Sequence, residues 1–206
     1  MKKFLLFLLL IVAVSAGVWF FLLRGKKNTH KGPKPVSMAV SKHSEAFNAS
    51  IESMLGNYYQ MNEAFVNWDA NKANESAAAL KQGLDSFSLK ELEKDSVEIA
   101  QSASFFLDNA RAEIQNIINQ PDIAAKRTSL NSLSDALYML MKTVRYDRSK
   151  LYLQECPMAF GENQSGYWLS ATQEVRNPYL GTQHPQYKAS MLNCGEPKDT
   201  LNFMQK

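Results

Sequence analysis

The chain has 206 residues, with 23 lysine and arginine residues, 20 aspartate and glutamate residues, three histidines and two cysteines. Residues 1–37 hold seven of the basic residues and no acidic one, so the remainder carries 16 basic and 20 acidic side chains. A nucleic-acid-binding domain needs a basic face on its folded part, and this composition argues against such a function.

The first predicted element is a transmembrane anchor in residues 1–23. Residues 4–23 are an uncharged run, which as a helix spans about 30 Å, the thickness of the hydrocarbon core of a bilayer. A cleaved signal sequence is the alternative, because two lysines precede the run and residues 14–16 resemble a cleavage site. The apolar run continues past that site through Trp19, which favours an uncleaved single-pass anchor in the inner membrane.

Residues 24–37 are predicted to form a basic, flexible linker, because they lack apolar periodicity and contain two glycines and two prolines. The basic residues of this linker outnumber those before the anchor. The positive-inside rule would therefore place the following domain in the cytoplasm. The short, signal-like N-terminus and the family resemblance described below favour the opposite orientation. We expect a domain that faces the periplasm.

Residues 38–147 are predicted to form an antiparallel up-down four-helix bundle, which makes the expected fold class all-α. Apolar residues recur every three or four positions in four segments, as on one face of a helix, and short connections favour antiparallel neighbours. Methionines on these helices are interpreted as core residues, and His43 as an exposed residue of the first helix. The predicted inward faces are Phe47, Ile51, Met54, Leu55, Tyr58, Met61 and Phe65; Ala73, Ala77, Leu80, Leu84 and Phe87; Ile99, Ala103, Phe106, Ala110, Ile114 and Ile117; and Leu130, Leu133, Leu137, Leu140 and Val144.

Residues 148–206 differ in composition and are predicted to form an irregular C-terminal cap on the bundle. They hold both cysteines and several glycines and prolines. Irregular segments on a rigid scaffold often carry function. The motifs that stand out are C-P-M-A from Cys156, W-L-S from Trp168, N-P-Y-L-G from Asn177 and M-L-N-C-G from Met191.

In combination these motifs resemble the tail of a domain-of-unknown-function family. That family occurs appended to periplasmic adaptor subunits of Cus-type heavy-metal efflux systems, and also as small anchored proteins. The resemblance covers roughly residues 45–200 and implies a periplasmic helical domain linked to copper or silver handling. The implied partners are the inner membrane and the adaptor or pump subunits. The adaptor's barrel and hairpin domains are absent, and the nine residues between Gly181 and Met191 are an insertion relative to the family pattern.

A soft-metal site is the predicted function of the cap. Thiolate and thioether sulfur are soft ligands that favour Cu(I) or Ag(I), and two of these residues, three apart, can share one side of a helical turn. We therefore expect accessory binding of Cu(I) or Ag(I) near a heavy-metal efflux system. The predicted ligands are Cys156, Met158, Met191 and Cys194, with His184 of the insertion as a further candidate.

A structural disulfide between Cys156 and Cys194 is the alternative, because cysteine pairs in oxidising compartments commonly form one. The cysteines are 38 positions apart, and closing such a loop would contribute about 3–4 kcal/mol. The chain would then be a structural or protein–protein interaction module without a metal. The residues interpreted as packing the cap, rather than as a cation–π platform for a metal, are Trp168, Asn177, Pro178 and Tyr179.

An enzymatic function is not expected. A nucleophilic cysteine needs a histidine partner, and of the three histidines His30 lies in the predicted linker. His184 lies in a loop without an evident carboxylate to orient it.

Overall fold

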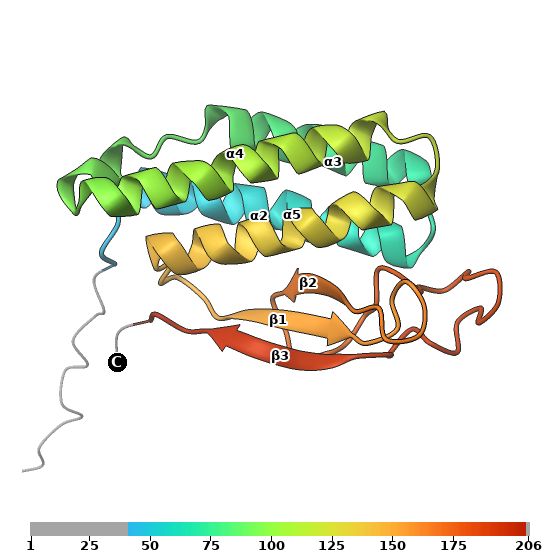
Figure 1. Ribbon diagram of the computed structural model, residues 1–206. Helices are drawn as coiled ribbons and strands as arrows, with labels where there is room; N and C mark the ends of the chain where they lie inside the picture. Colours follow the sequence, from blue (N-terminus) through green and yellow to red (C-terminus); the bar gives the residue numbers. More distant parts are fainter. Residues whose placement is uncertain (1–40, 205–206) are drawn as a thin grey trace, which may run out of the picture. The chain divides into compact units, whose positions relative to one another are not determined.

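The computed structural model describes residues 41–204, and within this range the chain forms four α-helices, one short 3-10 helix and a small sheet (Figure 1). The helices are α2 (Glu45–Val66), α3 (Ala70–Ser86), η1 (Lys90–Lys94), α4 (Val97–Asn119) and α5 (Ile123–Val144). The predicted anchor and linker, residues 1–23 and 24–37, lie outside the described residues. Between residues 41 and 204 no helix is both long and apolar enough to span a membrane.

The four α-helices begin at polar side chains that the sequence places just before each apolar stripe. Each side chain accepts a hydrogen bond from a backbone N–H in the first turn, which satisfies a donor that the helix itself leaves unpaired. The N-cap residues are Ser44, Asp69, Ser96 and Asp122.

Successive helices run in opposite directions and pack through their predicted apolar faces (Figure 1). The predicted inward residues of α2, α3 and α5 are all buried. In α4 the stripe is slightly rotated, because Leu107 is buried while Ile99 and Phe106 are only half-buried. The prediction of four helices is therefore confirmed. The 3-10 helix η1 between α3 and α4 was not predicted.

The C-terminal segment forms a three-stranded antiparallel sheet, so the prediction of an irregular cap was wrong in this respect and the fold is not all-α. The strands are β1 (Leu151–Cys156), β2 (Gly166–Ser170) and β3 (Glu196–Leu201), in the order β2-β1-β3. Leu151 pairs with Leu201, fifty positions along the chain. Because β1 and β3 are so far apart in the chain, their pairing cannot be recognised from either segment alone. Each strand contributes only a short run of residues to the sequence pattern.

The sheet lies alongside the bundle, next to α5, and its edge strand β2 is joined to the helices by side chains (Figure 1). The Leu169 N–H donates to the Tyr58 hydroxyl at 3.1 Å, and the Asn62 amide donates to the Leu169 carbonyl at 3.3 Å. The Tyr167 N–H donates to Asn131 Oδ1 at 2.7 Å. Side chains of the helices therefore form hydrogen bonds with backbone groups of β2 that would otherwise be exposed at the edge of the sheet.

Candidate functional site

The two cysteines meet at one end of the sheet. Cys156 is the last residue of β1 and is fully buried, and Cys194 is half-buried two residues before β3. Their Sγ atoms lie 2.8 Å apart. The structure therefore brings together the two predicted sulfur ligands that are most distant in the sequence.

Gly195 makes this approach possible. Its φ of +133° belongs to the region that favours glycine, and a Cβ at this position would lie 2.5 Å from the Glu155 carbonyl oxygen and 3.1 Å from the Trp168 ring. Because β1 and β3 pair at Glu155 and Glu196, the backbone around Gly195 is pressed against β1. This contact holds Cys194 beside Cys156.

The surroundings of Cys194 favour the thiol over the thiolate. Burial is the largest cause that raises the pKa of the Cys194 thiol to about 12, and the neighbouring Cys156 raises it further by its hydrogen bond and charge. Nucleophilic attack and metal ligation both use the thiolate. Reduced Cys194 is therefore protonated at neutral pH and is a poor nucleophile.

The other predicted ligands lie in different surroundings. Met158 and Met191 are half-buried and pack against the hydrophobic core, and the Met191 carbonyl accepts from the Cys194 N–H at 3.0 Å. His184 stacks on Tyr187 with 4.9 Å between ring centroids, and its Nδ1 accepts from two backbone N–H groups at 3.2 Å. In residues 41–204 no three His, Cys, Asp or Glu side chains are grouped so that they could hold a metal ion.

The N-P-Y-L-G motif forms a turn that contacts both the Cys194 segment and helix α5. Asn177 Oδ1 accepts from the Tyr179 and Leu180 N–H groups at 2.8 and 3.0 Å, and its amide donates to the Cys194 carbonyl at 2.8 Å. Pro178 is buried, and its carbonyl accepts a hydrogen bond from Arg127 of α5. The Tyr179 and Trp168 side chains are 2% and 1% exposed and pack edge to face.

Sequence reasoning missed Arg127, a buried cation of α5. Its Nε donates to the Pro178 carbonyl at 2.8 Å and its Nη2 to the Phe65 carbonyl at 2.9 Å, while the guanidinium lies 3.9 Å above the Trp68 ring. Burial lowers the pKa of Arg127 to about 10, so the side chain stays charged at neutral pH. The signal in the sequence was its position, three residues before Leu130 on the buried face.

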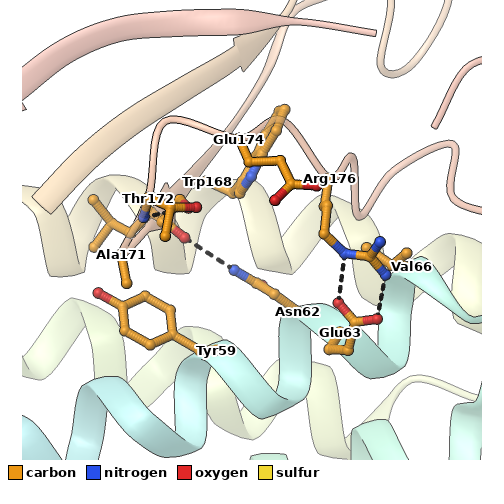
Figure 2. Close-up of a pocket in the computed structure, with 11 residues that line it drawn as sticks. Tyr59, Asn62, Glu63, Val66, Trp168, Ala171, Thr172, Glu174 and Arg176 are labelled. Atoms are coloured by element: carbon orange, nitrogen blue, oxygen red, sulfur yellow. Dashed lines mark hydrogen bonds and ion pairs between the residues drawn. The ribbon is translucent and has the colours of Figure 1, made fainter. Parts of the chain in front are cut away.

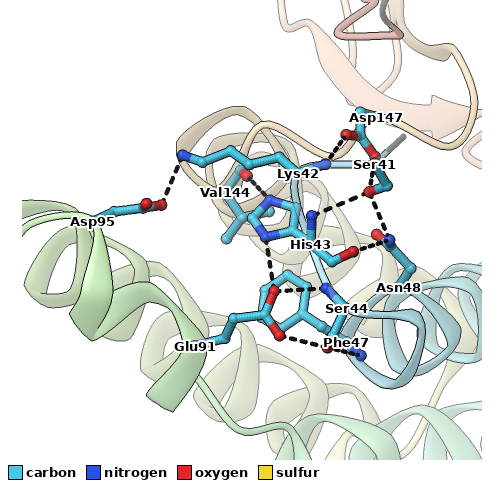
Figure 3. Close-up of polar contacts among 10 residues, drawn as sticks. All are labelled: Ser41, Lys42, His43, Ser44, Phe47, Asn48, Glu91, Asp95, Val144 and Asp147. Carbon is cyan, nitrogen blue, oxygen red and sulfur yellow. Dashed lines mark hydrogen bonds and ion pairs between the residues drawn. The ribbon is translucent and has the colours of Figure 1, made fainter. Parts of the chain in front are cut away.

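The expectation of an exposed His43 was wrong. His43 precedes α2 and is 6% exposed, between η1 and the end of α5 (Figure 3). Its Nε2 lies 2.6 Å from the Val144 carbonyl oxygen, and its Nδ1 lies 3.3 Å from Glu91 Oε1. Both partners accept hydrogen bonds, so only a ring protonated on both nitrogens donates to the two of them. This arrangement depends on residues 48 and 101 positions away, which no local pattern reveals.

Comparison with known proteins gives one family match. Residues 54–149 match the model of a family described as "Protein of unknown function (DUF3347)". The matched segment covers slightly less than half of the chain, most of the helical region, and ends before β1 and both cysteines. No curated protein and no solved structure matches. The family description names no metal, adaptor or efflux system.

Proposed function

We propose that the protein is a non-enzymatic interaction module of the cell envelope, whose C-terminal sheet is secured by a disulfide between Cys156 and Cys194. The observation that carries this proposal is the 2.8 Å separation of the two Sγ atoms. In an oxidising compartment two thiols in contact lose two protons and two electrons to a partner disulfide, which is reduced to two thiols. The new bond would close the 38-position loop between β1 and β3.

The same distance is less suited to a metal bridge. Two thiolates on one ion, with metal–sulfur bonds of about 2.3 Å, would lie about 3.8 Å apart at a tetrahedral angle and about 4.6 Å apart in a linear arrangement. Binding a metal would therefore require the cysteines to separate and to lose their protons against the raised pKa of Cys194. A disulfide requires only a small approach of two side chains.

Placement at the envelope rests on the sequence. The apolar run in residues 4–23 and the resemblance of the tail motifs to domains of Cus-type efflux adaptors support an anchored domain that faces the periplasm. In this proposal the helices and sheet present a surface to a protein partner near such a system. No catalytic step is assigned to the chain.

The redox state of the cysteines in the envelope tests the proposal. A membrane-impermeant maleimide is applied to cells with a permeabilised outer membrane, before and after mild reduction, and the mass of the intact chain is measured. Because Cys156 is buried and Cys194 is a poor nucleophile in the folded domain, the labelling is repeated on protein unfolded in denaturant, where we expect no label before reduction and two labels after it. Two labels without reduction would show free thiols and overturn the disulfide. Labelling only after lysis of the inner membrane would place the domain in the cytoplasm.

Soft-metal binding is the second candidate function, favoured by the convergence of two soft sulfur ligands from distant segments. Its test is an anaerobic Cu(I) titration of the reduced protein against a competing chelator. If the cap is a metal site, Cys156→Ser and Cys194→Ser each lose most of the affinity, whereas Met158→Leu and Met191→Leu lose less. His184→Ala reports whether the insertion supplies a ligand. Failure of the reduced protein to compete at any chelator ratio excludes this function.

A further inference from the structure

A small pocket between α2 and the loop after β2 is lined by Tyr59 and Asn62, each with a buried polar atom that has no hydrogen-bond partner among residues 41–204 (Figure 2). The pocket has a volume of about 190 Å³, and its walls come from α2, β2 and the loop through Arg176. Sites for drug-sized ligands typically measure roughly 300–1,000 Å³. The pocket therefore suits a small molecule.

Asn62 lines this pocket and holds a buried acceptor in its wall. Its side chain is 93% buried, since the residue is only 7% exposed, and its Nδ2 donates to the Leu169 carbonyl at 3.3 Å. Its Oδ1 has no hydrogen-bond partner in residues 41–204. Rotating the amide would set Oδ1 against the Leu169 carbonyl oxygen, so the amide stays as it is. The free Oδ1 therefore requires a donor.

Tyr59 lies one turn earlier on the same wall, and its hydroxyl is likewise buried and unpartnered among the described residues (Figure 2). Burial is the main cause that raises the pKa of Tyr59 above its ordinary value of 10, so the hydroxyl is neutral and can donate or accept. Buried polar groups normally have partners, in the protein or in what it binds. Within residues 41–204, the wall of the pocket thus carries two hydrogen-bonding groups that have no partner.

Arg176 and Glu63 of the pocket neutralise each other. Arg176 donates from Nε to Glu63 Oε2 at 3.0 Å and from Nη2 to Oε1, so it grips both oxygens of the carboxylate. Arg176 is the basic residue of the lining, and Glu174 adds a further exposed carboxylate. An anionic ligand would find no free cation in this lining. Because Glu174 remains unpaired by Arg176, the lining carries one net negative charge and disfavours an anionic ligand.

We propose that this pocket binds a small neutral molecule with at least two hydroxyl groups, such as a sugar unit. One hydroxyl donates to Asn62 Oδ1, and a second accepts from the Tyr59 hydroxyl. The carbon atoms of the molecule contact Val66 and Leu169, which supply the apolar part of the wall. The site does not involve either cysteine, so it is independent of the disulfide.

The test measures binding to the full-length protein by saturation-transfer NMR. Glucose and N-acetylglucosamine are the neutral probes, and glucuronate and glucosamine are the charged ones. The informative variant is Tyr59→Phe, which removes only the unpartnered hydroxyl. We expect saturable binding of a neutral probe and a loss of affinity of about three- to tenfold in Tyr59→Phe. Tyr187→Phe, outside the pocket, is the matched control and should bind as the wild type does.

Three results would overturn the proposal. Absence of saturable binding by both neutral probes would mean that the pocket holds only ordered water. Equal affinity of wild type and Tyr59→Phe would place the binding elsewhere. Tighter binding of glucuronate than of the neutral sugars would contradict the charge argument, and tighter binding of glucosamine would show that Glu174, rather than Asn62 and Tyr59, selects the ligand. Unfolding curves of each variant, recorded alongside, separate lost binding from lost structure.

Discussion

At Gly181 the C-terminal segment comes close to the end of α2. Its φ is +58°, and a Cβ there would lie 2.3 Å from the Val66 carbonyl oxygen and 2.8 Å from Trp68 Nε1. The next residue, Thr182, donates its N–H to the same carbonyl at 2.8 Å. A glycine is therefore required at the end of the N-P-Y-L-G motif, because the backbone there packs directly on the carbonyl of the last residue of α2. At Gly56, inside α2, a Cβ would meet no atom within 4 Å from the rest of residues 41–204, apart from its chain neighbours and the backbone of its own helix turn.

Alanine at these two glycines should change stability in opposite directions. Gly181→Ala forces a side chain into the left-handed region and against backbone, which should lower the free energy of unfolding by about 1–3 kcal/mol or more. Gly56→Ala removes conformational freedom of the unfolded chain in an open helical position and should raise it by about 0.5–1 kcal/mol. Urea unfolding of both variants gives the values. A neutral Gly181→Ala would refute the close contact with α2.

At the level of elements, the segment before α2 is tied to η1 and to the end of α5 by a polar cluster (Figure 3). Glu91 of η1 accepts from the Ser44 N–H at 2.8 Å and from the Ser44 hydroxyl, and it faces His43. Asp147, just after α5, accepts from the Ser41 hydroxyl at 2.6 Å and the Lys42 N–H at 2.9 Å. Two carboxylates therefore hold the start of the domain against elements from its middle and its end.

The contribution of Glu91 should depend on pH. Partial burial opposes ionisation, but hydrogen bonds from Ser44 and the interaction with His43 outweigh it and hold the pKa of Glu91 below its ordinary value of 4.5. A carboxyl group with a lowered folded-state pKa stabilises the protein above its unfolded-state pKa, and this stabilisation is lost as pH falls through the folded-state value. The difference in the free energy of unfolding between wild type and Glu91→Gln should therefore be largest above pH 4.5 and should shrink at lower pH.

Urea unfolding at pH 5.5 and at about pH 3 measures this difference. Glu93→Gln, an exposed residue of the same short helix, is the matched control and should change stability little at either pH. A Glu91→Gln difference that persists unchanged at the lower pH would show that the charge of Glu91 is not what stabilises the cluster.

Across the whole molecule, one hydroxyl connects three elements. The Tyr58 hydroxyl lies 2.6 Å from Ser134 Oγ of α5 and accepts from the Leu169 N–H of β2, while its ring belongs to α2. Burial, the largest cause, raises the pKa of Tyr58, so the hydroxyl is neutral and can donate to Ser134 while accepting from β2. The bundle and the sheet therefore share a buried hydrogen bond in addition to their apolar contact.

Removing this hydroxyl should weaken the attachment of the sheet. Tyr58→Phe leaves the Leu169 N–H and the Ser134 hydroxyl without this partner, which should lower the free energy of unfolding by about 1–3 kcal/mol. Tyr59→Phe, its neighbour, removes a hydroxyl that has no partner in the described part of the chain and should leave stability unchanged or slightly raised. Urea unfolding followed by tryptophan fluorescence compares the two, because Trp168 lies in β2. Equal effects would contradict the assigned hydrogen bonds.

Much of the helical region could be predicted from the sequence. The stripes Leu130–Leu133–Leu137 and Ile51–Leu55–Tyr58 are buried as expected, because helix faces repeat within four residues. Of the predicted cap and metal residues, Cys156 and Cys194 meet, whereas His184 is engaged by backbone N–H groups and Tyr187. The sequence motif showed which residues were unusual but not which of them touch.

Helix positions and most of the inward faces were determined by the sequence alone, because they depend on neighbours a few residues apart. The tertiary structure decided the pairing of β1 with β3, the burial of His43 and Arg127, and the pocket at Asn62. Each of these depends on groups that are 41 to 107 positions apart, such as Leu169 for Asn62 at 107 positions. Burial of a polar or charged side chain is tolerated only where such distant partners meet it, so local sequence cannot specify it.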